Sequence, residues 1–266
     1  MTERDERQVR RRTKGLTSAI LGVIAVCMSF QFGCKTGPTE PGIENPRAHI
    51  WTVDTLRLDP VRYPGPWQIL VQSMWGSATD LYAVGHSDGS AGTMWHFDGN
   101  NWSNVRLGVF EGGPIPAPYD LSAIHGVSPD NIYAVGERYG PTSYGTSFVV
   151  HFDGKQWKEE KTPGGYRLMS VWANAVNDVW ACGLDKTVLH YNGVEWTIDS
   201  VTFITPEGSQ NYLGSIAGIQ GNEMFMLGTA YHTSPTFSRW NYFFFRRQEN
   251  TWKLVPVPKS RLVLLV

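Results

Sequence analysis

Two short patterns of apolar and polar residues alternate along most of this chain. The first pattern is an apolar strand, a polar turn and a second short strand that closes on a glycine. It occupies residues 74–85, 124–136 and 171–183, and most weakly residues 216–228. The closing glycines are 51, 47 and 45 residues apart. Regular spacing of this size indicates an internal structural repeat.

The second pattern places a hairpin turn between two apolar runs. Asp-Gly or Asn-Gly favours such a turn because both residues tolerate positive φ, and the Trp that follows offers a large apolar area to a neighbouring sheet. Residues 246–252 form a decayed fourth copy. The turn residues are Asp98, Gly99, Asp153, Gly154, Asn192 and Gly193, and the repeated tryptophans are Trp51, Trp102, Trp157, Trp196 and Trp252.

One period of the repeat holds four strands. In the second copy we expect them at about residues 121–127, 131–136, 147–152 and 156–160. A single four-stranded sheet cannot bury both of its faces, whereas stacked sheets can, and four strands in this span is the period of a propeller blade. The sequence therefore predicts an all-β fold, a β-propeller-like array of about four four-stranded blades.

The two ends of the repeat region predict a partial fifth blade. Residues 51–56 match the fourth-strand segments, so a fourth strand arrives before any first strand. At the other end, residues 261–266 are apolar enough for one further strand, which leaves an exposed edge that soluble proteins normally avoid. We expect an open or truncated ring, with pairing to another chain as the alternative.

The repeats over residues 68–256 resemble those of bacterial Asp-box (BNR) propellers, which include sialidase-like and photosystem II assembly factor-like proteins. In an Asp box, Asp and Gly also form the hairpin between the third and fourth strands and precede an aromatic residue. Here Asp and Gly are adjacent, and His precedes them where the family has Ser or Thr. The resemblance implies the propeller architecture.

The N-terminal segment has the pattern of an export signal. Basic residues dominate positions 1–14, positions 15–33 carry no charge, and Cys34 precedes a Pro/Gly-rich stretch. With Gly33 before it, Cys34 resembles the lipidated cysteine of a bacterial lipobox. We predict a signal peptide at 1–33, a linker at 34–47 and the repeat domain at 48–266, with an uncleaved anchor or an ordinary cleaved signal as alternatives. The protein then lies in the cell envelope, lipid-anchored to a membrane and facing the periplasm or the exterior.

Composition narrows the possible chemistry. The net charge is −1 and the basic excess is confined to the N-terminus, which argues against a nucleic-acid partner. Cys27 and Cys34 lie in the signal region, so Cys182 stands alone in the repeat domain and cannot form an internal disulfide there. Repeated histidines fall in different blades, which argues against a shared metal site. We predict no metal, no cofactor and no catalytic residue, and we favour a protein without enzymatic activity over an enzyme.

Variable loops on a rigid scaffold usually carry function, and here they join strands 2 and 3 and successive blades. Their aromatic side chains suit stacking on a glycan or anchoring a protein partner. We therefore predict a binding or scaffolding module, with a sialidase-like carbohydrate-active enzyme and an assembly factor for a membrane complex as alternatives. The candidate binding residues are Phe110, Tyr119, Tyr139, Tyr144, Tyr166, Phe203, Tyr231, Phe237 and Trp240.

Overall fold

The computed structural model describes residues 56, 68–87, 92–108, 113–116, 118–139, 145–219 and 223–256. The chain divides into two compact units, Met1–Asp54 and Thr55–Val266, and every described residue belongs to the second. No helix in this described part has the length and apolar character needed to cross a membrane. Cys34, Trp51, Phe110 and Tyr144 lie outside the described residues, as do the predicted signal, linker and C-terminal strand.

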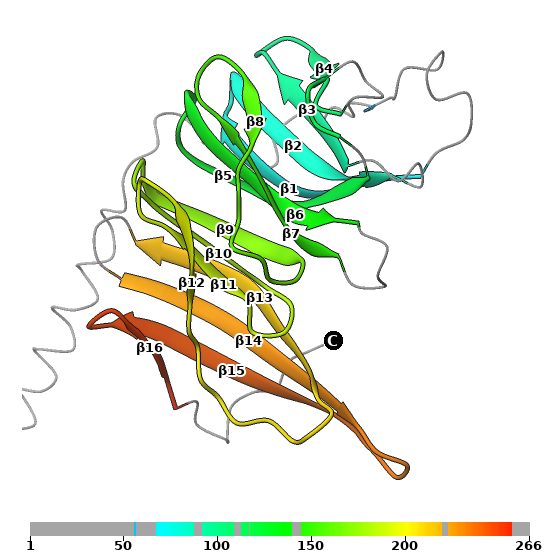
Figure 1. The fold of residues 1–266 in the computed structure, drawn as a ribbon. Helices are drawn as coiled ribbons and strands as arrows, with labels where there is room; N and C mark the ends of the chain where they lie inside the picture. The colour runs from blue at the N-terminus through cyan, green and yellow to red at the C-terminus, as the bar shows by residue number, and fades with distance from the viewer. Residues whose placement is uncertain are drawn as a thin grey trace, which may run out of the picture. The chain divides into compact units, whose positions relative to one another are not determined.

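The described residues form four four-stranded antiparallel sheets, each made of four consecutive strands (Figure 1). The first sheet contains β1 (Ile69–Ser77), β2 (Asp80–Ser87), β3 (Gly92–Phe97) and β4 (Trp102–Asn104). The second contains β5 (Tyr119–Ser128), β6 (Asn131–Arg138), β7 (Thr146–Phe152) and β8 (Trp157–Glu159). The third contains β9 (Leu168–Ala175), β10 (Asp178–Gly183), β11 (Val188–Tyr191) and β12 (Trp196–Asp199). The fourth contains β13 (Gln210–Ile219), β14 (Glu223–Thr233), β15 (Ser238–Gln248) and β16 (Thr251–Leu254).

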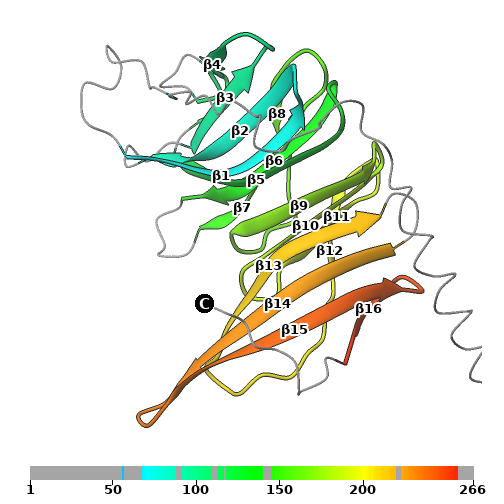
Figure 2. The same cartoon turned by 180° about the vertical axis from the view of Figure 1, so that it is seen from behind.

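The sheets follow one another through their first strands. β1 contacts β5, β5 contacts β9, and β9 contacts β13, as seen from behind in Figure 2. Hydrogen bonds link these strands: the backbone N–H of Ile124 donates to Ser73 Oγ at 3.2 Å, and that of Ile216 donates to Ser170 Oγ at 3.1 Å. The predicted all-β array of four-stranded, propeller-like blades is confirmed for these four sheets.

Each middle sheet contributes alternate residues to two different cores. In β6, Ile132 and Ala134 pack in the core between the first and second sheets, whereas Tyr133 and Val135 pack in the core between the second and third. Successive side chains of a strand point to opposite faces, so a strand covered on both sides reads as a continuous apolar run. This is why the repeated strand sequences are apolar throughout and do not alternate with polar residues.

The repeated closing glycines mark a close crossing of backbones. In each sheet the first strand has a β-bulge beside the residue that pairs with the closing glycine of the second strand. A Cβ on Gly85 would lie 1.8 Å from the carbonyl oxygen of Leu70, and a Cβ on Gly136 would lie 1.9 Å from that of Asp120. Glycine is therefore required there for space, in addition to any role in ending the strand.

The predicted hairpin turns between the third and fourth strands are present in the first three sheets. Asp98 Oδ1 accepts hydrogen bonds from the backbone N–H groups of Asn100 and Asn101, both at 2.8 Å. Asp153 and Asn192 make the same pair of bonds in the next two sheets. The glycine after each adopts a positive φ between 82° and 92°. The side chain thus closes the turn, and the glycine reverses the chain.

A tryptophan at the start of each fourth strand packs on an aromatic residue of the preceding sheet. Trp157 meets Tyr82 edge-on with ring centroids 5.9 Å apart, Trp196 meets Tyr133 at 6.0 Å, and Trp252 meets Trp180 at 5.9 Å. The burial expected of Trp157 and Trp196 is confirmed. The same expectation for Trp102 is wrong: it is only half-buried, because no sheet precedes the first one among the described residues.

Candidate functional site

The two ends of each sheet carry different loops. In an up-and-down sheet, the turns between strands 1 and 2 and between strands 3 and 4 lie at one end. The loops between strands 2 and 3, and those that connect successive sheets, lie at the other end, which we call the loop end. The predicted binding face corresponds to the loop end.

A pocket of about 430 Å³ opens at the loop end between the third and fourth sheets. It combines residues from three loops: the connection into the third sheet, the β10–β11 turn and the connection into the fourth sheet. We call it the loop-end pocket. Its lining residues are Tyr166, Leu184, Asp185, Ser209, Gln210, Asn211 and Tyr212.

The pocket lies beside the hairpin whose second strand ends at its closing glycine: β10 stops at Gly183, whereas β2, β6 and β14 continue past theirs. Asp185 and Lys186 form a tight turn and both adopt positive φ, 46° and 61°. Such a conformation costs a residue other than glycine roughly 1 kcal/mol or more, and it persists only when neighbouring groups hold it. Here the N–H of Asp185 donates to the carbonyl oxygen of Asn211 at 2.9 Å, and Lys186 Nζ donates to that of Phe203 at 3.2 Å. The turn is thereby fixed against the start of the fourth sheet.

A glycine pair presents Tyr166 at the rim of the pocket. Gly164 and Gly165 have φ of 109° and 108°, values that other residues rarely adopt. The N–H of Tyr166 then donates to Thr187 Oγ1 at 3.1 Å, which fixes the backbone beside the β10–β11 turn. The Tyr166 side chain remains 40% exposed. The loop therefore holds an aromatic ring in contact with solvent at a fixed position.

Three donors of this pocket are used within the protein, whereas two acceptors have no partner among the described residues. Ser209 Oγ donates to the carbonyl oxygen of Pro206, Tyr212 Oη donates to Gln210 Oε1, and Asn211 Nδ2 donates to the carbonyl oxygen of Ser209. In contrast, Asn211 Oδ1 is buried without a hydrogen-bond partner. The carboxylate of Asp185 also has no ion pair with a described side chain. Two acceptor groups of the pocket are therefore left unused, and one of them is charged.

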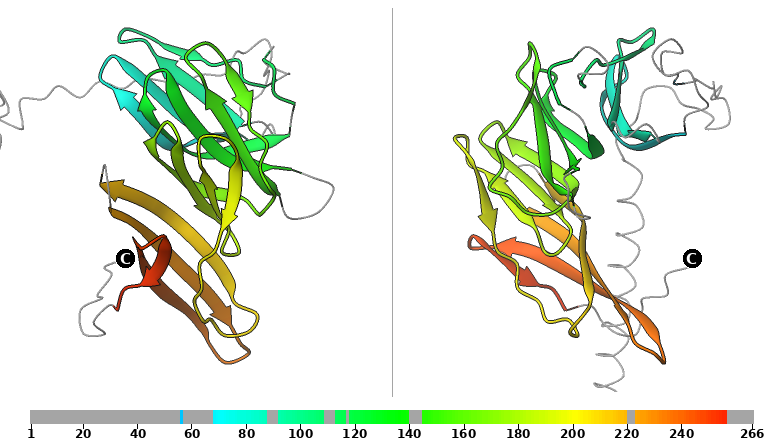
Figure 3. Two further views of the ribbon diagram at one scale, coloured as in Figure 1. Left: turned by 60° about the vertical axis from the view of Figure 1, so that its left-hand side comes forward. Right: turned by 45° about the vertical axis from the view of Figure 1, so that its right-hand side comes forward.

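Beside this pocket, the fourth sheet exposes an aromatic surface formed by Tyr212, Tyr231, Trp240 and Tyr242. The ring of Trp240 lies 4.7 Å from that of Tyr231 and 6.0 Å from that of Tyr212, centroid to centroid. Trp240 and Tyr242 are 50% and 49% exposed, and Phe237 at the hairpin tip is 55% exposed. The long β14–β15 hairpin that carries them projects past its neighbours in Figure 3. Because Tyr212 belongs to both features, the aromatic surface is continuous with the loop-end pocket.

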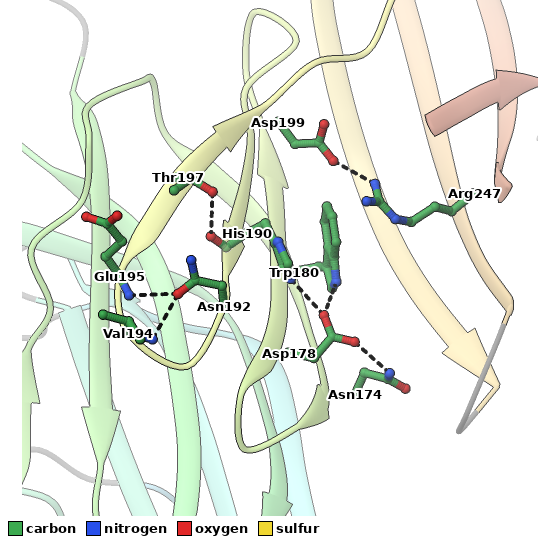
Figure 4. Close-up of polar contacts among 10 residues, drawn as sticks. All are labelled: Asn174, Asp178, Trp180, His190, Asn192, Val194, Glu195, Thr197, Asp199 and Arg247. Atoms are coloured by element: carbon green, nitrogen blue, oxygen red, sulfur yellow. Dashed lines mark hydrogen bonds and ion pairs between the residues drawn. The ribbon is translucent and has the colours of Figure 1, made fainter. Parts of the chain in front are cut away.

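The opposite end of the third sheet holds a compact polar cluster, drawn in Figure 4. Asp178 accepts hydrogen bonds from Trp180 Nε1 at 2.6 Å, from His190 Nε2 at 2.8 Å and from Asn174 Nδ2 at 2.8 Å. These bonds, the one from His190 foremost, lower the pKa of Asp178 to about 2. The carboxylate is thus ionised and fully occupied within the protein.

Arg247 completes this cluster from the fourth sheet. Its guanidinium lies over the ring of Trp180, 3.9 Å from the centroid, and pairs with Asp199 at 2.6 Å (Figure 4). A second pocket, of about 300 Å³, opens beside these groups. Because the charged groups that line it are already paired within the protein, it offers less to a ligand than the loop-end pocket does.

The repeated histidines have a structural role in the first three sheets. Each stacks on the aromatic residue paired with it in the second strand: His96 on Tyr82 at 4.4 Å, His151 on Tyr133 at 4.1 Å and His190 on Trp180 at 3.9 Å. His96 also contacts Asp80 at 2.7 Å, as His190 contacts Asp178. Within the described residues, no group of three His, Cys, Asp or Glu side chains is placed to hold a metal ion.

The predicted binding residues divide between the surface and the core. Tyr139, Tyr166, Phe237 and Trp240 are exposed and Tyr231 is half-buried, whereas Phe110 and Tyr144 lie outside the described residues. Tyr119 and Phe203 are buried, so the expectation that they line a binding face is wrong. Tyr119 packs on Phe148 at 5.0 Å, and Phe203 packs on Phe245 at 5.2 Å beneath Lys186.

Sequence reasoning missed the polar half of the pocket. Asp185, Asn211 and Tyr212 were not among the predicted residues, although the shortness of the loop after Gly183 is visible in the sequence. A hairpin that projects less than its neighbours leaves a hollow beside it. The short segment after Gly183 could therefore have pointed to the residues around that hollow. The pairing of Asp185 with Asn211 depends on how two sheets meet, which no local pattern encodes.

Comparisons with known proteins give a distant relative and similar solved structures. No protein-family model matches the chain. Over 137 residues, which are 52% of this chain, it is 26% identical to the protein described as "Immune protein Tsi7" of Pseudomonas aeruginosa. The alignment spans 40% of the length of that relative. The solved structure "YCF48 bound to D1 peptide" is similar with a TM-score of 0.36 and 12% identity, covering 71% of this chain and 84% of that one.

Proposed function

We propose that this chain is an exported, lipid-anchored module that binds another protein across the loop ends of its third and fourth sheets. The observation that carries the proposal is the aromatic surface of the fourth sheet together with the loop-end pocket beside it. Tyr and Trp are enriched in protein interfaces, where they bury large area at little cost in side-chain entropy. Trp240 and Tyr242 offer such area on a rigid hairpin.

Binding is favoured over catalysis by the state of the arginines. A sialidase-like site needs several arginines converging on a substrate carboxylate. Four described arginines instead each pair with a carboxylate of this protein, and they are spread over three sheets. The pairs are Arg138–Glu159, Arg167–Glu137, Arg246–Glu223 and Arg247–Asp199. The description of the relative as an immune protein also supports a binding role.

A protein partner is favoured over a glycan by the hydrogen-bonding capacity of the pocket. Sugar hydroxyls both donate and accept, so a glycan site normally offers donors as well as acceptors. Ser209, Tyr212 and Asn211 already use donor groups within the protein. The aromatic surface is moreover an extended sheet face, which suits a macromolecular partner better than a single sugar ring.

The binding surface is tested by site-specific photo-cross-linking in intact cells. A benzophenone amino acid at position 242 should form a discrete adduct with an envelope protein, identified by mass spectrometry. The matched control is position 194, because Val194 is 85% exposed but follows the β11–β12 turn at the opposite end. Adducts at 194 and none at 242 would contradict the proposal, as would the same products at both positions.

Anchoring is tested separately by metabolic labelling with a fatty-acid analogue. The label should be lost in Cys34→Ala and retained in Cys27→Ala. One acyl chain binds a membrane only marginally, so we expect more than one chain on the mature N-terminus. Label that follows Cys27 instead would contradict the assignment of the lipidation site.

A further inference from the structure

We infer that the loop-end pocket binds the guanidinium group of an arginine side chain from the protein partner. The inference rests on the proposed function and adds the chemistry of the contact. It starts from two acceptors of the pocket, Asn211 Oδ1 and the Asp185 carboxylate, that no described side chain satisfies.

Two open acceptors define what a ligand must supply. Asn211 Oδ1 is buried without a partner, and a buried acceptor left unpaired is costly. Asp185 adds a negative charge at the same pocket that no described cation neutralises. A group with several N–H donors and a positive charge satisfies both acceptors, whereas an anion or a pure acceptor satisfies neither.

The lysine next to Asp185 in the sequence is held away from this role. Lys186 follows Asp185 directly, but its ammonium donates to the carbonyl oxygen of Phe203 and lies over the Phe203 ring, 4.6 Å from the centroid. Lys186 is therefore fixed on the far side of the turn and does not line the pocket. The negative charge of Asp185 is thus available to a ligand.

The tyrosines select guanidinium over ammonium. Tyr166 and Tyr212 are among the lining residues, and a planar guanidinium can stack on an aromatic face while its edge donates hydrogen bonds. A lysine ammonium is more strongly hydrated and offers no flat face. A volume of about 430 Å³ accommodates the group together with part of its side-chain stem.

Neighbouring contacts hold the turn that carries Asp185 in one conformation. Both of its residues are in a strained, left-handed conformation, and the N–H of Asp185 is bonded to Asn211. Strain that is kept by neighbouring contacts is typical of groups positioned for a function. Asp185 and Asn211 therefore keep a constant relative geometry, which is what a bidentate ligand requires.

The experiment measures binding of N-acetyl-arginine amide to the full-length protein by NMR. N-acetyl-citrulline amide is the matched probe, because it has nearly the same shape without the charge. We expect the arginine probe to shift the Asn211 side-chain amide signals saturably and to bind at least tenfold more tightly than the citrulline probe. Equal binding of both probes, or no saturable shift with arginine, would overturn the inference.

Asp185→Asn removes the charge and keeps the turn, because Asn tolerates the left-handed conformation. It should weaken arginine binding at least tenfold without changing the melting temperature by more than a few degrees. Glu207→Gln, on the exposed connection that precedes the pocket, is the control and should leave binding unchanged. Unaltered binding in Asp185→Asn would also overturn the inference.

The two proposals fail in distinguishable ways. Arginine binding without an adduct at position 242 would support the pocket and contradict the docking surface. An adduct at 242 without arginine binding would support protein binding and overturn the assignment of the pocket.

Discussion

The first three sheets and the fourth share one repeat but keep different parts of it. In the first three, an aromatic residue of the second strand stacks on a histidine and receives a tryptophan from the next sheet. In the fourth, Phe225 occupies the same place and stacks on Phe244, 5.4 Å away, and Arg246 replaces the histidine and pairs with Glu223. Among the described residues, no tryptophan of a following sheet contacts Phe225.

The difference shows which repeated residues serve packing between sheets. The Asp-Gly and Asn-Gly turns of the first three sheets are replaced in the fourth by Glu249 and Asn250, both at positive φ. The first strands show the same change: Trp75, His125 and Trp172 form a row of rings, while the fourth sheet has exposed Ala217 at this position. The repeat is kept in the sheets that another described sheet follows and is relaxed in the fourth, which no described sheet follows.

The largest expected effect is on stability and concerns the tryptophans that begin the fourth strands. Trp196→Ala should lower the free energy of unfolding by roughly 3–5 kcal/mol, because Trp196 is buried between the second and third sheets. Trp102→Ala should cost roughly 1–2 kcal/mol, since that side chain is only half-buried. Urea denaturation of both variants provides the measurement. Equal losses would show that burial between sheets does not set the contribution of this residue.

The closing glycines give the next largest difference. Gly136→Ala places a Cβ 1.9 Å from the carbonyl oxygen of Asp120, so backbone must move, and we expect a loss of roughly 3 kcal/mol. In Gly228→Ala the closest atoms to the new Cβ are side-chain atoms of Leu213 and Phe245, each 3.1 Å away, which can shift, and the carbonyl oxygen of Tyr212 is at an ordinary contact distance of 3.6 Å. That variant should stay within about 1 kcal/mol of the wild type. Thermal denaturation provides the measurement. A larger loss of stability in Gly228→Ala than in Gly136→Ala would contradict the prediction.

The ion pair between the third and fourth sheets can be replaced by the apolar pair found between the first and second sheets. Arg247 and Asp199 stand where the interface between the first two sheets has Phe152 and Val105. Arg247→Phe alone should cost about 2 kcal/mol because it leaves Asp199 unpaired. The double variant Arg247→Phe with Asp199→Val should return to within about 1 kcal/mol of the wild type, since apolar pairs often replace buried ion pairs without loss. A double-mutant cycle measures this coupling, and strictly additive losses would contradict it.

The sequence predicted the parts of the structure that depend on local pattern. The Asp-Gly turns, the apolar strands and the spacing of the repeat each follow from a few neighbouring residues, and together they define four sheets. The burial of Tyr119 and Phe203 could not be predicted in this way, because it depends on how the neighbouring segments pack over each residue. The loop-end pocket could not be predicted for the same reason: Asp185 and Asn211 meet only because two sheets pack side by side.

The smallest effect concerns pH and the row of rings along the first strands. Burial lowers the pKa of His125 to about 4, and its Nδ1 accepts a hydrogen bond from the N–H of Ala173 at 3.1 Å. The unfolded chain binds a proton at this histidine near pH 6.5 while the folded chain does not, so stability falls as the pH drops from about 6.5 to 4. We expect this loss to be roughly 1–2 kcal/mol, because part of the ring remains in contact with solvent and water screens its charge.

The variant His125→Gln tests this assignment, since its side-chain oxygen can still accept the bond from Ala173 but does not titrate in this range. Urea denaturation between pH 7 and pH 4 should therefore show a shallower decline for His125→Gln than for the wild type. His190→Gln is the control, because His190 stacks on Trp180 at the repeated histidine position and lies outside the row of rings that contains His125. If the slope of the His125→Gln variant matched that of the wild type, another group would be responsible. The half-buried histidine between Trp75 and Trp172 would then be a packing element without influence on the pH dependence of folding.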